Sequence, residues 1–255
     1  MEALRVECLS KDFGGVHALS DVSFSVKTGE RLVIIGPNGA GKTTLFNLIN
    51  GQLRPTSGRI YFFGKDITTV ATHCRAQLGQ GRSFQTISLF PNITVIDNTL
   101  IALHGTKHSR FQIFRSAKGY EHLLVRAREM LTSVTLWEKK DELVKNISYG
   151  EQRRLEIVLT LASKPRLLLL DEPSSGLTGA ESADITDMIH KLGRDITVLL
   201  VAHDIDLVFG VAERIIVLHY GQVIADGTPQ EIQAEPRVKE IYMGIEENAR
   251  DSTAG

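Results

Sequence analysis

The sequence predicts an α/β fold: a mostly parallel sheet covered by helices, with an antiparallel β section at the start and an inserted helical section near the middle. Short apolar runs, typical of buried parallel strands, alternate with segments of helical periodicity. Residues 1–30 instead alternate apolar and polar side chains, as half-buried antiparallel strands do. Between about residues 86 and 163 the pattern is mainly helical.

In chain order, the antiparallel section comes first. Leu4–Leu9 and Val22–Val26 are each followed by a polar or glycine-containing turn, and residues 59–64 are expected to join the same sheet. The apolar run Leu32–Ile35 predicts a buried strand, and the residues after it predict a helix over Thr44–Ile49. Three later core strands are predicted at Leu167–Leu170, Thr197–Val201 and Ile215–Leu218.

Length and composition fit one large domain over residues 1–255, with a helical subdomain at about 86–163 and a C-terminal tail at about 236–255. The net charge of -1 gives no basic field, so no nucleic-acid partner is predicted. Cys8 and Cys74 form neither a metal-type spacing nor a disulfide framework. No run approaches the roughly 18 apolar residues that cross a bilayer, so any membrane role is expected to come through other proteins.

Residues 36–44 fill every fixed position of the phosphate-binding pattern G-x-x-x-x-G-K-[ST], which favours a real site over an accidental glycine-rich turn. Glycines let backbone N–H groups close around phosphate oxygens, Lys42 reaches the outer phosphates, and Thr43 can ligate Mg²⁺. The following helix places its positive end under the anion. The sequence therefore predicts a site for a nucleoside triphosphate with Mg²⁺. The loop consists of Gly36, Pro37, Asn38, Gly39, Ala40, Gly41, Lys42, Thr43 and Thr44.

Two adjacent acids, Asp171 and Glu172, follow the four leucines of a predicted core strand. In an open α/β sheet, ligands bind beyond the carboxyl ends of the strands. Asp171 can hold Mg²⁺ through water, and Glu172 can orient or deprotonate an attacking water. An apolar run that ends in Asp-Glu-Pro is also typical of an ordinary turn. Together with the phosphate loop, it predicts a catalytic site.

A second candidate phosphate site begins at Ser148. Ser148 and Glu151 have the spacing of a capping box, so the segment can simply start a helix. The same geometry also suits a phosphate, because a helix N-terminus offers free N–H groups beside the small Gly150 and a hydroxyl. Since one ATP already has its own loop, a second phosphate site indicates an ATP shared between two subunits.

These motifs, in this order and over essentially the whole chain, resemble the nucleotide-binding subunit of an ABC transporter, whose core is a P-loop NTPase (RecA-like) fold. Residues 36–44 resemble the Walker A loop, Asp171 and Glu172 the Walker B acids, and residues 148–151 the signature motif. Three further residues complete the resemblance: Gln85 as the Q-loop glutamine, His203 as the switch histidine and Phe13 as the aromatic side chain that stacks on adenine.

The resemblance implies that two subunits, head to tail, sandwich two ATP molecules. Each ATP lies between the Lys42 loop of one chain and the signature motif of the other. Closure of the dimer drives transport and hydrolysis resets it, with Glu172 as the base and His203 holding the γ-phosphate and the water. The signature residues are Ser148, Tyr149, Gly150 and Glu151, and the implied Mg²⁺ ligands are Thr43, Gln85 and Asp171.

Within the family, four segments are most similar to ATPase subunits of branched-chain amino acid importers. These are residues 82–85, 149–157, a basic insertion near 105–119, and the ending 240–244. Importers of urea or short amides and ATPases that serve lipopolysaccharide export are also similar. The implied partners are a second ABC ATPase subunit, two transmembrane permease subunits and, indirectly, an extracytoplasmic solute-binding protein. The implied location is the cytoplasmic face of the cell membrane.

Three residues depart from the commonest family pattern. Tyr149 stands where that pattern has a glycine, Glu151 where it has a glutamine, and Thr178 where the D-loop has Asp or Asn. Thr178 can equally cap a helix that begins near Ala180. Because such importers commonly carry two different ATPase subunits, a heterodimer is favoured over a homodimer.

Two other classes of protein are disfavoured. Soluble ABC ATPases that act on nucleic acid or ribosomes generally fuse two cassettes or add basic and coiled-coil segments, whereas this chain has one cassette and no long heptad run. A P-loop kinase or GTPase would leave Gln85 and His203 without a role. The basic side chains of residues 105–119 are interpreted as a solvated loop, with lipid or permease contact as the alternative; they are Lys107, Arg110, Arg115 and Lys118.

Overall fold

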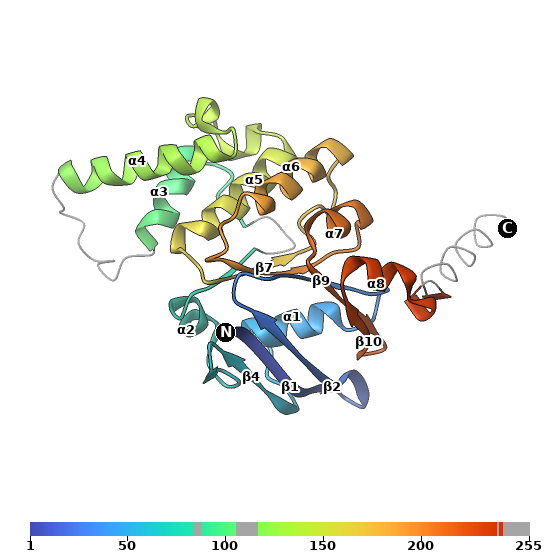
Figure 1. Cartoon of the computed structure of the whole chain (residues 1–255). Helices are drawn as coiled ribbons and strands as arrows, with labels where there is room; N and C mark the ends of the chain where they lie inside the picture. Colours follow the sequence, from blue (N-terminus) through green and yellow to red (C-terminus); the bar gives the residue numbers. More distant parts are fainter. Residues whose placement is uncertain (84–87, 106–116, 239, 242–255) are drawn as a thin grey trace.

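The computed structural model describes residues 1–83, 88–105, 117–238 and 240–241, and it contains two sheets flanked by helices (Figure 1). A four-stranded antiparallel sheet has the order β2-β1-β4-β5, and a six-stranded sheet has the order β10-β9-β3-β8-β7-β6. In the second sheet β9, β3, β8, β7 and β6 run parallel, and β10 is antiparallel to β9. The predicted α/β class with an N-terminal antiparallel section is confirmed.

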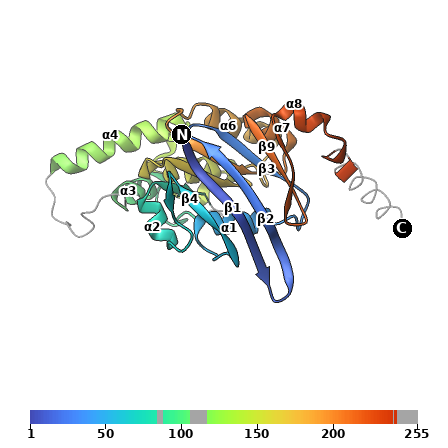
Figure 2. The ribbon, with the colours of Figure 1, turned by 60° about the horizontal axis from the view of Figure 1, so that its bottom comes forward.

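The antiparallel sheet contains the strands that the alternating pattern predicts. Leu4 and Val6 of β1 are buried, because alternate side chains of a strand point to the same face, and Leu9 is buried beyond a shift of register between Val6 and Leu9. β1 and β2 form a long hairpin (Figure 2). The strands are β1 (Glu2–Phe13), β2 (Val16–Lys27), β4 (Ser57–Phe62) and β5 (Lys65–Asp66).

The inner strands of the larger sheet, β3, β8, β7 and β9, are buried on both faces, which explains why they are apolar at most positions. Odd and even leucines of β7 enter different cores: Leu167 and Leu169 pack towards α1 and the antiparallel sheet, and Leu168 and Leu170 towards α6 and α7. The three predicted core strands are confirmed. The strands are β3 (Arg31–Ile35), β6 (Gln80–Arg82), β7 (Leu167–Asp171), β8 (Thr197–Val201), β9 (Arg214–His219) and β10 (Gln222–Gly227).

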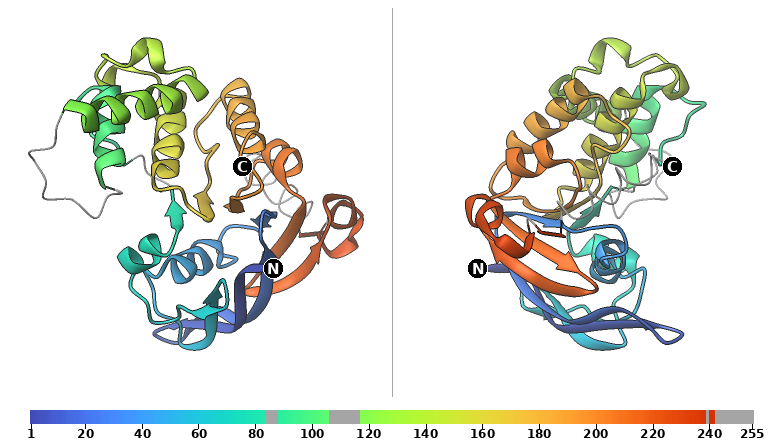
Figure 3. Two further views of the ribbon diagram at one scale, coloured as in Figure 1. Left: turned by 60° about the vertical axis from the view of Figure 1, so that its left-hand side comes forward. Right: turned by 90° about the vertical axis from the view of Figure 1, so that its right-hand side faces the viewer.

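Helices α3, α4 and α5 gather at the end of the molecule away from the antiparallel sheet (Figure 3). They have apolar clusters of their own, in which Val95, Leu131 and Leu155 are buried. The limits of a helical subdomain at about 86–163 stay a prediction. The helices are α1 (Lys42–Asn50), α2 (Thr72–Gln77), α3 (Val95–Gly105), α4 (Ala117–Ser133), α5 (Tyr149–Thr160), α6 (Gly179–His190), α7 (Ile205–Val211) and α8 (Pro229–Ala234), with 3₁₀ turns at Trp137–Lys139, Val144–Asn146 and Leu161–Ser163.

Several predicted features lie outside the described residues: Gln85, most of the basic insertion, and the end of the chain from residue 242. Of the basic residues, only Lys118 falls within a described helix, α4. Across the described ranges, no helix is both long and apolar enough to span a membrane.

A buried cation fixes the end of the helix that follows the phosphate loop. Arg75 is 1% exposed, and its guanidinium donates to the carbonyls of Leu48 and Ile49 in the last turn of α1, at 2.9 and 2.6 Å. It also donates to the carbonyls of Thr68 and Val70. Burial lowers the pKa of Arg75 to about 10, so the side chain stays charged at neutral pH. The C-terminal carbonyls of α1 therefore have partners, and the helix is held against the sheet.

We expect Leu199→Ala to lower the free energy of unfolding by about 2–5 kcal/mol, because it opens a cavity in the centre of the sheet. Leu199 is 0% exposed on β8, directly between Leu32 of β3 and Leu169 of β7. Urea unfolding measures the change, with Val125→Ala on the exposed face of α4 as the control. Equal midpoints for the two variants would contradict this assignment of the core.

Candidate nucleotide site

The phosphate loop connects β3 to α1, as the sequence predicts, and its lysine turns back over it. Lys42 Nζ donates to the carbonyl oxygens of Gly36 at 2.6 Å and of Pro37 at 2.9 Å. Burial lowers the pKa of Lys42, while the nearby carboxylates of Glu172 and Asp171 oppose that shift. The ammonium is thus held in place before any ligand arrives.

The first and last glycines of the loop are required by close approach of other backbone. A Cβ at Gly36 would overlap the carbonyl oxygen of Leu218, and one at Gly41 would come within 2.6 Å of the carbonyl oxygen of Ala18. Gly41 is also the N-cap of α1, with a φ of 100°. No side chain caps this helix start and no acid lies in its first turn, so its N–H groups are available to an anion.

A cavity of about 400 Å³ lies over the loop. Its wall is built by residues that are far apart in the sequence: the phosphate loop, the start of β2, the acid after β7 and the turn between β9 and β10. The described lining residues are Val16, His17, Ala18, Asn38, Gly39, Ala40, Gly41, Lys42, Thr43, Thr44, Glu172 and Tyr220.

The two predicted catalytic acids lie at the carboxyl end of β7. Asp171 is 3% exposed, and burial raises its pKa against the opposing charge of Arg82, whose Nη2 lies 3.4 Å from Asp171 Oδ2. Glu172 reaches the cavity. Its φ of 46° is in the left-handed region, which is uncommon for a residue with a Cβ.

His203 follows β8, the neighbouring strand, and its side chain is exposed. His203 Nδ1 lies 3.6 Å from Glu172 Oε1. The backbone N–H of Glu172 donates to Val201 O at 2.8 Å, which ties the loop of the acid to the strand of the histidine. The structure therefore brings together Lys42, Glu172 and His203, as expected from strand ends at one edge of a parallel sheet.

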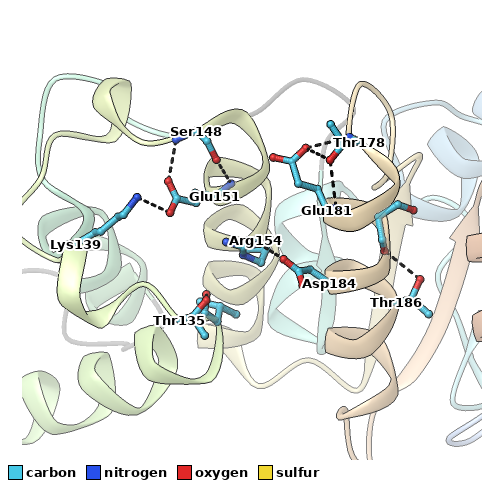
Figure 4. A network of polar contacts seen from close by, with 11 residues as sticks. Thr135, Lys139, Ser148, Glu151, Arg154, Thr178, Glu181, Asp184 and Thr186 are labelled. Carbon is cyan, nitrogen blue, oxygen red and sulfur yellow. Dashed lines mark hydrogen bonds and ion pairs between the residues drawn. The ribbon is translucent and has the colours of Figure 1, made fainter.

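The capping box predicted at Ser148 is present (Figure 4). Ser148 Oγ accepts from the N–H of Glu151 at 3.2 Å, and Glu151 Oε2 accepts from the N–H of Ser148 at 2.9 Å. Lys139 Nζ forms an ion pair with Glu151 at 2.7 Å. Tyr149 is 46% exposed, so this turn presents an open surface.

Thr178 is the N-cap of α6 and forms a second capping box with Glu181, which confirms the capping role considered for it. The helix begins at Gly179. The carboxylate of Glu181 lies so close to Gly150 that a Cβ added to this glycine would overlap it. Helix α6 is therefore in contact with residues 148–151, the signature turn (Figure 4). Arg154 of α5 and Asp184 of α6 form an ion pair beside this contact.

Some predicted residues lie apart from the cavity, and some lining residues were not predicted. Phe13, at the end of β1, is 45% exposed and does not line the cavity, with Lys11 Nζ 4.9 Å from its ring centre. Val16 and Tyr220, both exposed, do line it. Tyr220 has a φ of 44°, in the left-handed region; the sequence gives no signal of this position beyond the following Gly221.

A phosphate loop between a strand and a helix, with acids at the carboxyl end of another parallel strand of the same sheet, defines a P-loop nucleoside triphosphatase. The family described as ABC transporter matches residues 19–175, and the family described as branched-chain amino acid ATP-binding cassette transporter matches residues 222–248. The chain therefore belongs to the ABC transporter ATPases.

Individual proteins of this family are similar in sequence to this chain over nearly their whole length. The high-affinity branched-chain amino acid transport ATP-binding protein BraF of Pseudomonas aeruginosa is 37% identical, over 94% of this chain and 97% of that protein. The lipopolysaccharide export system ATP-binding protein LptB of Acidithiobacillus ferridurans is 36% identical, over 95% of this chain and 97% of that protein.

Solved structures are similar over nearly the whole chain. The ADP conformation of an ATP-binding cassette of an ABC transporter has a TM-score of 0.84 and 34% identity, covering 96% of this chain and 99% of that one. A dimeric post-hydrolysis cassette bound to ADP and Pi has a TM-score of 0.75 and 27% identity, covering 88% of this chain and 98% of that one.

We expect Gly36→Ala to lower the free energy of unfolding by about 2–4 kcal/mol and to weaken ATP binding, since the new methyl group displaces the loop from Leu218. The control is Gly64→Ala. Gly64 has a φ of 79° with no atom near the added Cβ, so only backbone strain of about 1–2 kcal/mol is expected there. Urea unfolding and titration with a fluorescent ATP analogue give both quantities. Unchanged ATP affinity in Gly36→Ala would contradict the tight packing of the loop.

Glu181→Gln tests the cap of α6 through pH. Hydrogen bonds from the backbone N–H and the hydroxyl of Thr178 lower the pKa of Glu181 below its ordinary value of 4.5. The stabilising contribution of the charged form is therefore complete above pH 4.5 and is lost as the pH falls through the folded-state pKa. We expect Glu181→Gln to have a lower urea midpoint than wild type at pH 7, with the difference shrinking in acid. Glu121→Gln, on exposed α4, should show no such trend.

Proposed function

We propose that this chain is the ATP-hydrolysing, nucleotide-binding subunit of an importer for branched-chain amino acids. The match of residues 222–248 to the branched-chain amino acid cassette family supports this substrate class, as does the similarity to BraF. The chain acts at the cytoplasmic face of the cell membrane, where permease subunits hold it. The solute contacts those subunits and an extracytoplasmic binding protein, whereas this chain contacts ATP.

The observation that carries the mechanism is the separation of two phosphate-type sites within one chain. Lys42 and Glu172 line the nucleotide cavity, but none of its described lining residues comes from 148–151. The cavity is therefore completed by the signature turn of a second ATPase subunit, packed head to tail so that two ATP molecules are enclosed. The similar cassette that is dimeric with ADP and Pi supports this arrangement. The second subunit is a different ATPase chain in the favoured assembly, and a second copy in the alternative.

Within each shared site, Lys42 and the first-turn N–H groups of α1 bind the phosphates. The partner subunit's signature turn, the equivalent of residues 148–151 here, binds the γ-phosphate from the other side. Glu172 accepts a proton from the attacking water, and His203, 3.6 Å away, holds the water and the γ-phosphate in line. Phe13, exposed at the end of β1 and outside the cavity lining, is proposed to stack on an adenine ring that extends beyond the cavity.

Mg²⁺ fits the donor atoms that are present. The hydroxyl of Thr43 borders the cavity and the carboxylate of Asp171 is buried at the strand end, and Mg²⁺ prefers such oxygen ligands, partly through water. Gln85, the third ligand implied by the sequence, lies outside the described residues. When bound, Mg²⁺ neutralises charge on the β- and γ-phosphates.

A groove of about 400 Å³ between β6 and helices α3 and α5 suits the permease. Phe90 and Ile101 line it and remain 58% and 49% exposed, so they offer apolar contact to a partner. We assign this groove to a cytoplasmic helix of a transmembrane subunit. The assignment also explains how this chain serves a membrane process without a described membrane-spanning helix.

A lipopolysaccharide exporter is the second candidate, supported by the 36% identity to LptB. Import of branched-chain amino acids is favoured because a separate match at residues 222–248 points to that class of cassette. Import of urea or short amides remains the third candidate. Coexpression with each class of permease, followed by solute uptake or export assays, separates these functions.

We expect Glu172→Gln to reduce kcat for ATP hydrolysis by at least about 100-fold, because the general base is lost. ATP binding should persist, since Lys42 and the loop are untouched, and the bound ATP should then hold an ATPase dimer together. Steady-state phosphate release and light scattering with Mg-ATP measure the two effects. Glu235→Gln, the same substitution at a residue that does not line the cavity, is the control. Normal turnover by Glu172→Gln would contradict the assigned base.

The dependence of the rate on protein concentration identifies the second subunit. A specific activity that rises with the concentration of the isolated chain is expected for a homodimer. A negligible rate despite ATP binding is expected when a different ATPase chain or the permease completes the site.

A further inference from the structure

We infer that Arg153 is a positioning residue that holds the backbone of Glu172 in its left-handed conformation. Arg153 lies in the second turn of α5, five residues after Ser148, and it is 1% exposed. It does not line the nucleotide cavity. Its guanidinium points instead to the loop that carries the two acids. The inference rests on the function proposed for Glu172.

Arg153 contacts each residue of the segment 171–173, which we call the acid loop. Nη2 donates to the carbonyl oxygens of Asp171 at 3.0 Å and of Glu172 at 3.1 Å, and Nε donates to that of Pro173 at 3.1 Å. Three successive carbonyls are therefore held by one planar group. Only arginine presents donors in such a fixed fork, so a lysine cannot reproduce this set of contacts.

The loop needs such support because its conformation is unfavourable by itself. Glu172 has a φ of 46°, which persists only where the surroundings over-determine it. The N–H of Glu172 donates to Val201 O at 2.8 Å, on the side of β8. Arg153 holds the carbonyl side. Both the N–H and the carbonyl group of Glu172, the proposed base, are thus held by hydrogen bonds.

Arg153 is fixed in turn by Glu156, one turn further along α5. Arg153 Nη1 donates to Glu156 Oε2 at 2.6 Å, and Glu156 is 5% exposed. Glu156 also lines the groove assigned to the permease. One buried ion pair therefore joins the wall of that groove to the backbone of the base. The same helix begins with the signature turn, so both interfaces of the chain have a direct connection to Glu172.

Arg153→Lys tests the inference, because it keeps the charge that compensates Glu156 and removes the fork. We expect kcat to fall by about 10- to 100-fold, the loss caused by misplacing a reacting group by about 1 Å. The Kd for ATP should change less than about twofold, because uniform binding is not affected. Glu172, Ser175 and Leu177 lie in the turn after β7, and their backbone amide protons are hydrogen-bonded. These protons should exchange with solvent faster in Arg153→Lys than in wild type.

Arg126→Lys is the matched control. Arg126 of α4 is a partly buried arginine that also donates to a backbone carbonyl, that of Ala162 at 2.8 Å, which lies outside residues 171–173. It should keep the wild-type rate and the wild-type exchange of residues 172–177. Should Arg153→Lys fold poorly, the double variant Arg153→Met, Glu156→Gln removes both charges together and should show the same faster exchange.

The outcomes separate the inference from the proposed function. Wild-type kcat and unchanged exchange at residues 172–177 in Arg153→Lys would overturn the positioning role. A loss of ATP affinity and of global stability in parallel with kcat would also overturn it, because that pattern marks a merely structural residue. If the wild-type chain hydrolyses no ATP even when it is assembled with its partner ATPase and permease subunits, the proposed function is at fault, and the exchange measurement alone decides the role of Arg153.

Discussion

The parallel register of β3, β8 and β7 is the constraint on which the site depends. Val201 of β8 is level with Ile34 of β3 on one side and with Asp171 of β7 on the other. The phosphate loop, the acids and His203 therefore leave the sheet at one edge. Since side chains alternate along a strand, a slip of one residue would turn Asp171 to the other face and exchange the two apolar cores. The burial that fixes this register also fixes the relative positions of the predicted catalytic residues.

Two buried arginines fix the positions of helices relative to the sheet. Arg75 satisfies the last carbonyls of α1, and Arg153 satisfies three carbonyls after β7. In both places a helix or strand comes to its end, where carbonyls run out of regular backbone partners, and unpaired buried carbonyls are costly. A long side chain with a planar set of donors meets this need from a neighbouring element. The elements around the nucleotide are consequently joined by polar contacts of defined direction as well as by apolar packing.

Local sequence patterns predict those strands, loops and helix caps whose structure depends on residues close together in the sequence. The alternation in β1 and β2, the apolar runs of β3, β7 and β8, the loop at residues 36–44 and the capping box at Ser148 all follow from short-range rules. The short strand β6 has no apolar run, because Gln80 to Arg82 pair only with β7. Tyr220 and Arg153 reach their positions through contacts distant in sequence. Those residues become recognisable only when the fold brings the β9–β10 turn to the phosphate loop and α5 to the acids.

The signature turn can both cap helix α5 and bind a phosphate, because Lys139 offsets the negative charge of the capping residue Glu151. An acid at position 151, in place of the glutamine of the commonest family pattern, adds negative charge where a phosphate is proposed to bind. Burial raises the pKa of Glu151, but the hydrogen bonds from Lys139 and from the N–H of Ser148 outweigh it and lower that pKa, so Glu151 is ionised. Lys139, 2.7 Å away, offsets this charge. The turn therefore keeps the stabilising cap of an acid without repelling an anion, and the partial positive charge of the α5 N-terminus remains available to the partner's ATP.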